Sequence, residues 1–292
     1  SRTPASPAVR ATVLAALLDS HAAASFLPDS VRVAFEAAFG AQSTQALREL
    51  GIRYCLRIVQ LAEGRALQLA SPLIYRGMLR LIRSTAHVRS AASGSGAAAE
   101  ADAQTAVTRG LAYDVIGACA HRAPHLFRNG LDTAQLLFAA VMTEDGAMKL
   151  SAHGALSAVG AALVAAFADE AARSGADDAE PLPLEQQGQV IGLLESHATQ
   201  ADARVRAAVA DWAVRMFSRR HVRSMLLLTE LGGARERLVR DAAAPALEVP
   251  ARVRTALALR LARLRFRHRH SHCVATEAEA EAEGEIEALT PD

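Results

Sequence analysis

Residues 202–212 read Asp-Ala-Arg-Val-Arg-Ala-Ala-Val-Ala-Asp-Trp, and residues 234–243 read Ala-Arg-Glu-Arg-Leu-Val-Arg-Asp-Ala-Ala. The Val205-Arg206 pair returns as Val239-Arg240, an offset of 239 − 205 = 34 residues, and Met148-Lys149 is a weaker echo. Offsets from the thirties to the fifties are typical of stacked helix pairs joined by loops of variable length. The recurrence therefore predicts helical repeats, which build surfaces for partners more often than active sites.

The composition of the 292-residue chain favours the same fold class. Hydrophobic residues make up 51% of it but aromatic residues only 4%, so the core must consist mainly of Ala, Leu and Val. Ala and Leu are strong helix formers, whereas a chain rich in strands would need more Ile, Tyr, Phe and Thr. We therefore expect an all-α fold, namely a HEAT-repeat-like α-solenoid, a superhelix of antiparallel helix pairs.

Hydrophobic spacing and loop signals divide the chain into segments. Helical repeats are expected over 1–88 and again over 102–247. The Ser, Gly and Ala stretch at 89–101 lacks large apolar residues and predicts a flexible loop. Ser-Gly, acidic residues and two prolines predict an inserted loop at 173–183. Residues 248–292 are first basic and then acidic, which predicts a partly disordered tail.

Two local patterns carry further expectations. Gly64 is expected to end one helix, and Ser71-Pro72 to start its partner, because serine caps helices and proline suits their first position. The uncharged run from Gly154 to Ala168 is shorter than the ~20 residues needed to span a bilayer. It predicts a buried helix and no membrane insertion.

The net charge limits the classes of partner that the chain could bind, and the cysteines indicate the cellular compartment. The net charge is +1, from 32 basic and 31 acidic residues, which argues against a nucleic-acid partner. Cys55, Cys119 and Cys273 show no disulfide or metal-ligand spacing, so a reducing compartment is expected, cytoplasmic and also nuclear.

The sequence shows little that would support catalysis. It contains no P-loop, no Gly-x-Ser-x-Gly turn and no His-Glu-x-x-His pair, so we expect no enzyme, no cofactor and no small-molecule substrate. His268, His270, His272 and Cys273 could bind a transition metal, but the alternating arginines oppose a cation. No metal site is expected.

Six arginines lie around the turns of the last repeats and could form one positive ridge. They are Arg219, Arg220, Arg223, Arg235, Arg237 and Arg240. Arginine is enriched where carboxylates are recognised, so the ridge predicts an acidic partner surface. The alternative is a solvated face whose arginines pair with neighbouring acids, namely Asp211, Glu230, Glu236 and Asp241.

Two stretches carry motifs that resemble those of one known family. The first is the run from Gly110 to Phe127, Gly-Leu-Ala-Tyr-Asp-Val-Ile-Gly-Ala-Cys-Ala-His-Arg-Ala-Pro-His-Leu-Phe. Its structural corner consists of Arg122, Pro124, Leu126 and Phe127, which match the family's Arg-x-Pro-x-Leu-Phe pattern. The second stretch runs from Val205 to Val239, but Arg223 stands where the family usually has proline, and Gly233-Ala234 replaces Asp-Pro.

Together the two stretches resemble the ECM29 family of proteasome adaptor and scaffold proteins. The resemblance implies a fragment from the C-terminal region of a large HEAT-repeat protein. Such a protein would be a non-catalytic scaffold that bridges or stabilises the proteasome core particle and regulatory particle, in proteasome assembly and quality control. A karyopherin-like or trafficking adaptor built from the same repeats is the alternative, and an accessory domain of an enzyme is a third class. An adaptor of that kind usually carries acidic inner-face residues, which this chain lacks.

Overall fold

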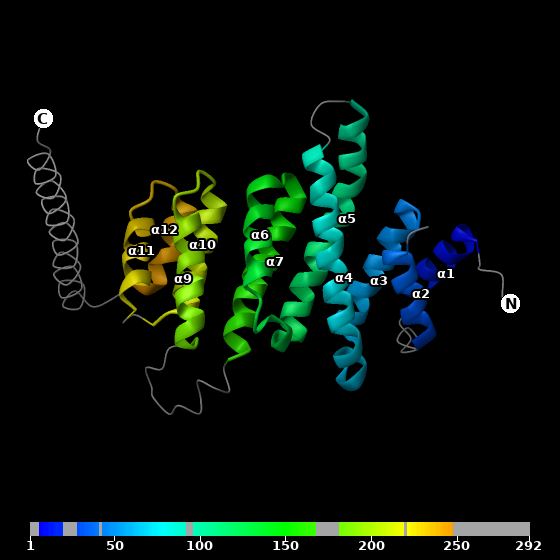
Figure 1. Ribbon diagram of the computed structural model, residues 1–292, viewed down its shortest axis with the longest axis horizontal. Helices are drawn as coiled ribbons and strands as arrows, with labels where there is room; N and C mark the ends of the chain where they lie inside the picture. Colours follow the sequence, from blue (N-terminus) through cyan, green and yellow to red (C-terminus); the bar gives the residue numbers. More distant parts are fainter. Residues whose placement is uncertain are drawn as a thin grey trace, which may run out of the picture. The chain divides into compact units, whose positions relative to one another are not determined.

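The computed structural model describes residues 6–19, 28–40, 43–91, 96–167, 181–218 and 221–247. Every regular element in these ranges is a helix (Figure 1), which confirms the all-α prediction. The chain divides into two compact units, residues 1–243 and 244–292. The first unit contains the helix pairs, and only the end of the last helix is described in the second.

The helices follow one another along the chain with short connections. In order they are α1 (Pro7–Asp19), α2 (Pro28–Phe39), α3 (Gln45–Leu61), α4 (Gly64–Ala91), α5 (Gly96–Arg122), the 3-10 helix η2 (Pro124–Phe127), α6 (Leu131–Thr143), α7 (Gly146–Ala165), α9 (Leu184–Ala198), α10 (Ala203–Met216), α11 (Val222–Gly232) and α12 (Arg237–Leu247).

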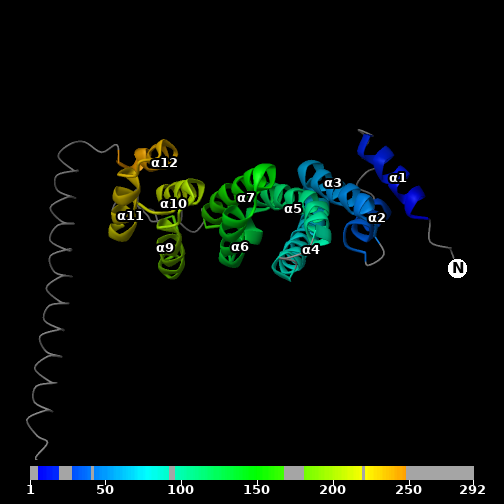
Figure 2. The ribbon, with the colours of Figure 1, turned by 90° about the horizontal axis from the view of Figure 1, so that it is seen from above.

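Packing within the first unit follows the chain order, as in a solenoid. Neighbouring helices pack as the pairs α2/α3, α4/α5, α6/α7 and α9/α10. The second members then contact one another in succession, α3 with α5, α5 with α7, and α7 with α10. Seen from above, these helices form one row and α4, α6 and α9 another (Figure 2). Each repeat therefore contacts only its neighbours, which is the arrangement that the recurring phrase predicts.

Helix α10 shows how the sequence specifies one repeat. Asp202 caps its start, since the carboxylate accepts a hydrogen bond of 2.8 Å from the backbone N–H of Arg204. Val205, Trp212 and Met216 on one face of the helix are completely buried. This spacing puts them on a single stripe, so burial of that stripe holds α10 between its neighbours.

The arginine of the recurring phrase makes the same local contacts in both copies. Arg206 donates to the backbone carbonyl groups six and five residues before it, the second at 2.8 Å. Arg240 donates to the carbonyl groups six and five residues before it, at 3.1 and 2.5 Å. Carbonyl groups in the turn before a helix have no helical partner of their own, so this arginine satisfies them in each repeat.

The same basic position also joins successive repeats. Lys149 Nζ lies 2.5 Å from Asp202 Oδ2, and Arg206 Nη2 lies 2.6 Å from Glu236 Oε1. The two acids are equivalent, because 236 − 202 = 34, the offset of the repeat. We call these two ion pairs the charged ladder. It connects the start of α7 to the start of α10, and the start of α10 to the turn before α12.

Helix α4 differs from the sequence prediction. It begins at Gly64, whose φ of +49° is accessible to glycine, and continues through Pro72. The expected start at Ser71-Pro72 is therefore wrong. Ala70, Ile74 and Met78 are buried on one face of this helix, and that continuous apolar face offsets the cost of a proline inside it.

The loop predicted at 89–101 is largely helical instead. Helix α4 extends to Ala91 and α5 begins at Gly96, because the alanines there favour helix more than the serines and glycines oppose it. Residues 92–95 lie outside the described ranges. So do 168–180, which hold most of the loop predicted at 173–183, and the predicted tail at 248–292.

Helix α7 is long and apolar enough to cross a membrane by length and composition. Its residues Ala152, Leu156, Val159 and Leu163 are buried. It packs against α5 on one side and against α6 and α10 on others. These contacts are those of a core helix in a stack of helices.

Candidate interaction surfaces

Three of the four ridge arginines that the structure describes are paired within the protein. Arg223 binds Glu195 through two hydrogen bonds of 2.6 and 3.0 Å, and Arg237 lies 3.2 Å from Asp241. Arg240 binds backbone carbonyl groups, as described above. Arg235 is exposed at the turn before α12.

These pairs decide how much of the ridge is available to a partner. A guanidinium held by both oxygens of one carboxylate has little capacity left for a second acid. Of the acids expected to pair with the ridge, Asp241 does so, with Arg237. Glu236 pairs instead with Arg206, which lies outside the ridge. Arg219 and Arg220 lie outside the described residues, so they remain a prediction.

The predicted corner joins three helices. Pro124 starts the short helix η2 at the end of α5, and Phe127 at its end is completely buried. The Phe127 ring lies 4.9 Å from the ring of Tyr75 on α4. Arg122 donates a 2.8 Å hydrogen bond to the carbonyl oxygen of Ala62, which caps α3, and Leu126 is half-buried. The arrangement makes this corner a structural element.

A buried ion pair escaped the sequence analysis. Arg109 on α5 donates to both oxygens of Glu144, at 2.7 and 3.1 Å, and both side chains are almost completely buried. Tyr113 donates to the same carboxylate at 3.0 Å, and Arg109 also donates to Thr105 at 3.0 Å. The one sequence signal for this pair is Arg109 itself, a charged residue on a helix that is otherwise largely apolar. The pair ties α5 to the turn between α6 and α7.

The two cysteines in the described residues are held in unreactive forms. Burial raises the pKa of the Cys55 thiol and of the Cys119 thiol to about 12, so both stay protonated at neutral pH. His121 and His125 are both exposed, and the helix break at Pro124 separates them. Within the described ranges no three His, Cys, Asp or Glu residues could hold a metal ion. The segment with His268, His270, His272 and Cys273 lies outside them.

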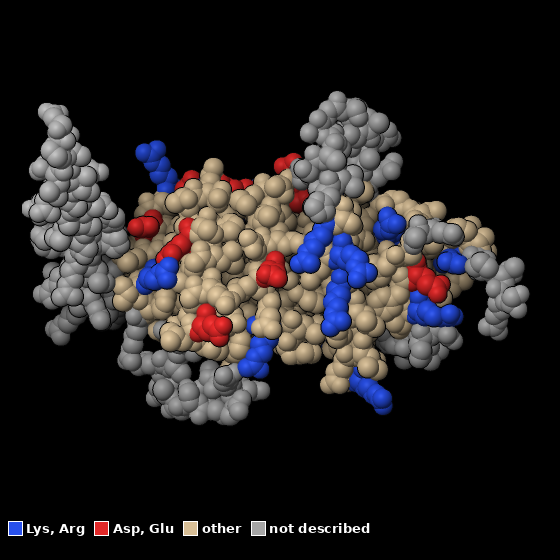
Figure 3. Space-filling view, viewed as in Figure 1, with Lys and Arg blue, Asp and Glu red and all other residues tan. Residues whose placement is uncertain are grey.

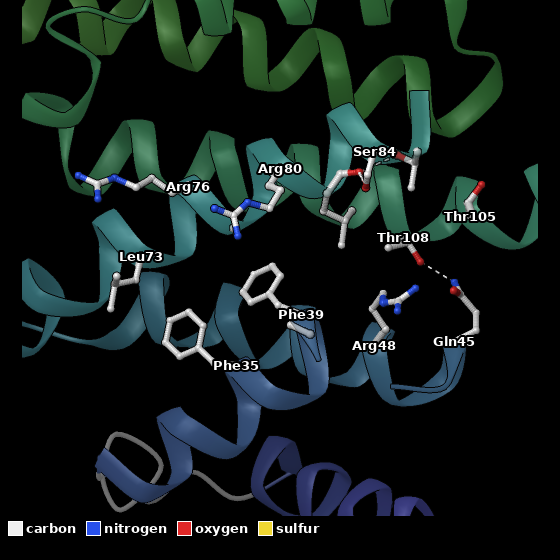
Figure 4. A pocket seen from close by; sticks show the side chains of 14 residues that line it. Phe35, Phe39, Gln45, Arg48, Leu73, Arg76, Arg80, Ser84, Thr105 and Thr108 are labelled. Carbon is white, nitrogen blue, oxygen red and sulfur yellow. Dashed lines mark hydrogen bonds between the residues drawn. The ribbon is translucent and has the colours of Figure 1, made fainter. Parts of the chain in front are cut away.

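A groove of about 630 Å³ lies among α2, α3, α4 and α5 (Figure 4). Phe35 and Phe39 of α2 and Leu73 of α4 form its apolar walls. Arg76 and Arg80 line it from α4, and Arg48 lines it from α3. We call this site the α2–α5 groove. No local sequence pattern predicts this groove, because its lining comes from four helices.

The three arginines of the α2–α5 groove differ from those of the ridge. The structure gives no ion pair and no hydrogen bond for the guanidinium groups of Arg48, Arg76 and Arg80 among the described residues. Arg76 and Arg80 are exposed, one helical turn apart. Basic side chains gather over α4 on the face shown in Figure 3. The groove thus presents positive charge that no acid of the described chain neutralises.

Two comparisons with known proteins point to the same family. The family model described as "Proteasome component ECM29, N-terminal" matches residues 1–228. The human protein named "Proteasome adapter and scaffold protein ECM29" is 24% identical over 254 residues, which are 87% of this chain and 12% of the human protein. An engineered protein solved by the Northeast Structural Genomics Consortium aligns with a TM-score of 0.47 and 15% identity, covering 84% of this chain and 92% of its own.

The matched region corrects one expectation. The motifs were expected to represent the C-terminal region of the family, whereas the matching model describes the N-terminal part. Helical repeats resemble one another along a long solenoid, because each uses the same caps, stripes and turns. A corner motif therefore identifies the family better than the position within it.

Proposed function

This chain belongs to the ECM29 family of proteasome components, and from that membership we propose that it is a non-catalytic scaffold segment that binds the proteasome. The observation that carries the proposal is the family match over residues 1–228. The chain spans 12% of the length of its human relative, so it would supply one part of a longer contact surface.

The architecture supports a scaffold of this kind. The helix pairs stack through one row of helices and leave the outer row and the turns accessible. Stacked repeats bind partners through such extended surfaces. We further propose that the scaffold bridges or stabilises the core particle and the regulatory particle, and that it acts in proteasome assembly and quality control.

The side chains support binding without chemistry. The thiols of Cys55 and Cys119 are held protonated by burial, so neither is a nucleophile at neutral pH. The buried Glu144 is occupied by Arg109 and Tyr113, which leaves it engaged in holding helices together. The scaffold therefore needs no cofactor, metal or small-molecule substrate in this proposal.

The proposed location is the cytoplasm and the nucleus. Cys55 and Cys119 are free thiols in the core, and free cysteines suit a reducing compartment. Fluorescence imaging of the protein tagged at its own gene tests the location, and a signal confined to the secretory pathway would contradict it.

Affinity purification of the protein tagged at its own gene tests the function. We expect enrichment of both core-particle and regulatory-particle subunits in quantitative mass spectrometry. Recovery of only one particle would retain proteasome binding and contradict bridging. Recovery of neither would overturn the proposal.

A photo-crosslinking amino acid tests whether this segment contacts the proteasome. Leu69 of α4, Leu150 of α7 and Leu184 of α9 are 64%, 55% and 83% exposed, so replacement leaves the core intact. We expect at least one site to form adducts with proteasome subunits. A crosslinker at Leu14, which is completely buried, is the matched control and should form none.

A further inference from the structure

The polar groups that line the α2–α5 groove fall into two classes. The hydroxyl groups are used within the protein, since Thr85 donates to the carbonyl of Leu81 at 2.9 Å and Ser84 donates to the same carbonyl at 2.9 Å. Thr108 accepts a 2.5 Å hydrogen bond from Gln45, which closes one end of the groove. The guanidinium groups of the lining have no such partner in the part of the chain that the structure describes, so the groove offers charge rather than neutral hydrogen bonds.

The apolar part of the groove is fixed by close packing. The Phe35 and Phe39 rings lie 5.8 Å apart on successive turns of α2. Phe39 lies so close to Gly77 that a Cβ there would fall 2.4 Å from the ring, and this contact holds the ring against α4. Leu73 adds an exposed apolar surface at the open side, with 57% of it accessible. The apolar walls are therefore preformed.

We propose that the α2–α5 groove binds an acidic peptide segment of a partner protein, in extended conformation, with alternating acidic and large apolar residues. Arg76 and Arg80 lie one turn apart along α4, a rise of ~6 Å. Alternate residues of an extended peptide lie about 6.6 Å apart on one side. Carboxylates at positions i and i+2 would thus meet the two arginines, while the intervening side chain faces the Phe35 and Phe39 rings on the opposite wall (Figure 4).

The observations favour a peptide over a polyphosphate or a nucleic acid. Phosphate-rich ligands need little apolar surface, whereas two phenylalanines and a leucine line this groove. The net charge of the chain is only +1, too small for binding that rests on neutralising many phosphates. A cavity of about 630 Å³ also has the size of a site for a few side chains.

This inference goes beyond the proposed proteasome function and stands apart from it. Binding of a synthetic peptide to the chain needs no proteasome, so either proposal can fail while the other holds.

Fluorescence anisotropy with the full 292-residue chain tests the inference. The probe is a labelled peptide of sequence Gly-Glu-Leu-Glu-Phe-Glu-Leu-Gly. We expect saturable binding that weakens as salt is raised. One control peptide has Gln in place of every Glu, and the other has Ser in place of Leu and Phe. Each control peptide should bind at least about tenfold more weakly than the probe.

Matched variants locate the binding in the groove. The double substitution Arg76→Gln/Arg80→Gln should weaken binding about tenfold or more, and Leu73→Asp should do so by repelling the acidic probe. All three positions are exposed, so folding should persist and circular dichroism should match the wild type. Arg65→Gln removes an exposed arginine from the same helix outside the groove and should leave the affinity unchanged.

Three results would overturn the inference. Equal loss in Arg65→Gln and in the groove variant would indicate attraction by net charge alone. Binding of inorganic polyphosphate that depends on Arg76 and Arg80, without binding of the peptide, would indicate a phosphate site. Peptide binding that appears only after removal of residues 277–292 would identify the chain's own acidic segment as the occupant.

Discussion

Lys149 Nζ lies 2.5 Å from Asp202 Oδ2, and this contact uses the one lysine of the chain to join two repeats. The same carboxylate accepts the backbone N–H of Arg204 and thereby caps α10. Partial burial opposes ionisation of Asp202, but the hydrogen bonds from Lys149 and from the Arg204 backbone outweigh it and lower the pKa of the carboxyl. The charge on Asp202 therefore serves the helix start and the contact between repeats together.

Replacing Lys149 by Met should loosen that contact. The ion pair is only partly buried, so we expect the free energy of unfolding to fall by about 0.5–1 kcal/mol in urea titrations. Hydrogen exchange should accelerate at the first turn of α10. Arg237→Ala removes an exposed i,i+4 pair as a control and should change stability by less than about 0.5 kcal/mol. Equal effects of both variants would contradict a special role for the charged ladder.

The Asp202 carboxylate should make stability depend on pH in a defined direction. Its pKa is lowered in the folded protein, so the unfolded chain binds the proton more readily as the pH falls. The stabilisation is complete above the ordinary pKa of 3.8 and is lost as the pH falls through the lowered value. Asp202→Asn keeps a good helix cap. The stability difference between wild type and this variant should be constant from about pH 5 to 7 and shrink below about pH 4.

Gly160 on α7 faces Trp212, the single tryptophan of the chain. A Cβ at residue 160 would lie 2.7 Å from Trp212 Nε1, which donates a 3.1 Å hydrogen bond to the carbonyl oxygen of Leu156. Gly160→Ala should therefore displace the indole, shift its fluorescence and cost about 1–3 kcal/mol. Gly154→Ala in the same helix meets nothing within 4 Å and should stabilise the fold by roughly 0.5–1 kcal/mol.

The buried pair of Arg109 and Glu144 should behave as a coupled unit. Arg109→Ala leaves an uncompensated carboxylate in the core, so we expect a loss of about 3–5 kcal/mol. The double substitution Arg109→Met/Glu144→Met removes both charges and should cost less than Arg109→Ala alone. Urea unfolding of the single and double variants measures the coupling. Additive effects would show that the two side chains act independently.

The two buried thiols should resist modification in the folded protein. With pKa values of about 12, roughly one in ten thousand is a thiolate at pH 8, and burial also blocks access. Cys273→Ser removes the third thiol, so any remaining reaction belongs to Cys55 and Cys119. We expect no release of thionitrobenzoate from Ellman's reagent until urea unfolds the chain. Rapid reaction without denaturant would contradict the burial.

The sequence predicted those parts of the fold that depend on local spacing. The recurring phrase at Val205-Arg206 predicts helical repeats, and Val205, Trp212 and Met216 are buried on one face of the helix that carries the phrase, as a repeat of this kind requires. Two local signals gave wrong predictions: the proline at Pro72 predicted a helix start, and the serines and glycines of 89–101 predicted a loop. In both places the helix continues, because burial of an apolar face or a run of alanines outweighs the local signal.

The candidate sites were harder to predict, since they depend on which helices meet. The ridge arginines lie close in sequence, but only the fold shows that Glu195 reaches Arg223 across 28 residues. The α2–α5 groove gathers Phe35, Arg76 and Thr108 from helices far apart along the chain. Contacts between distant segments leave no periodic trace in a single sequence.

The charged ladder also bears on how such chains tolerate insertions and deletions. Asp145, Asp202 and Glu236 each stand four residues before the basic residue of their repeat. Asp145 and Asp202 lie 202 − 145 = 57 residues apart, whereas Asp202 and Glu236 lie 34 apart, and yet Lys149 and Arg206 each reach the acid of the following repeat. The connecting stretch can thus gain or lose residues without altering the join between neighbouring units. Changes in loop length during evolution then leave the packing between repeats unchanged. Relatives are therefore better aligned on these acidic and basic positions than on a repeat of constant length.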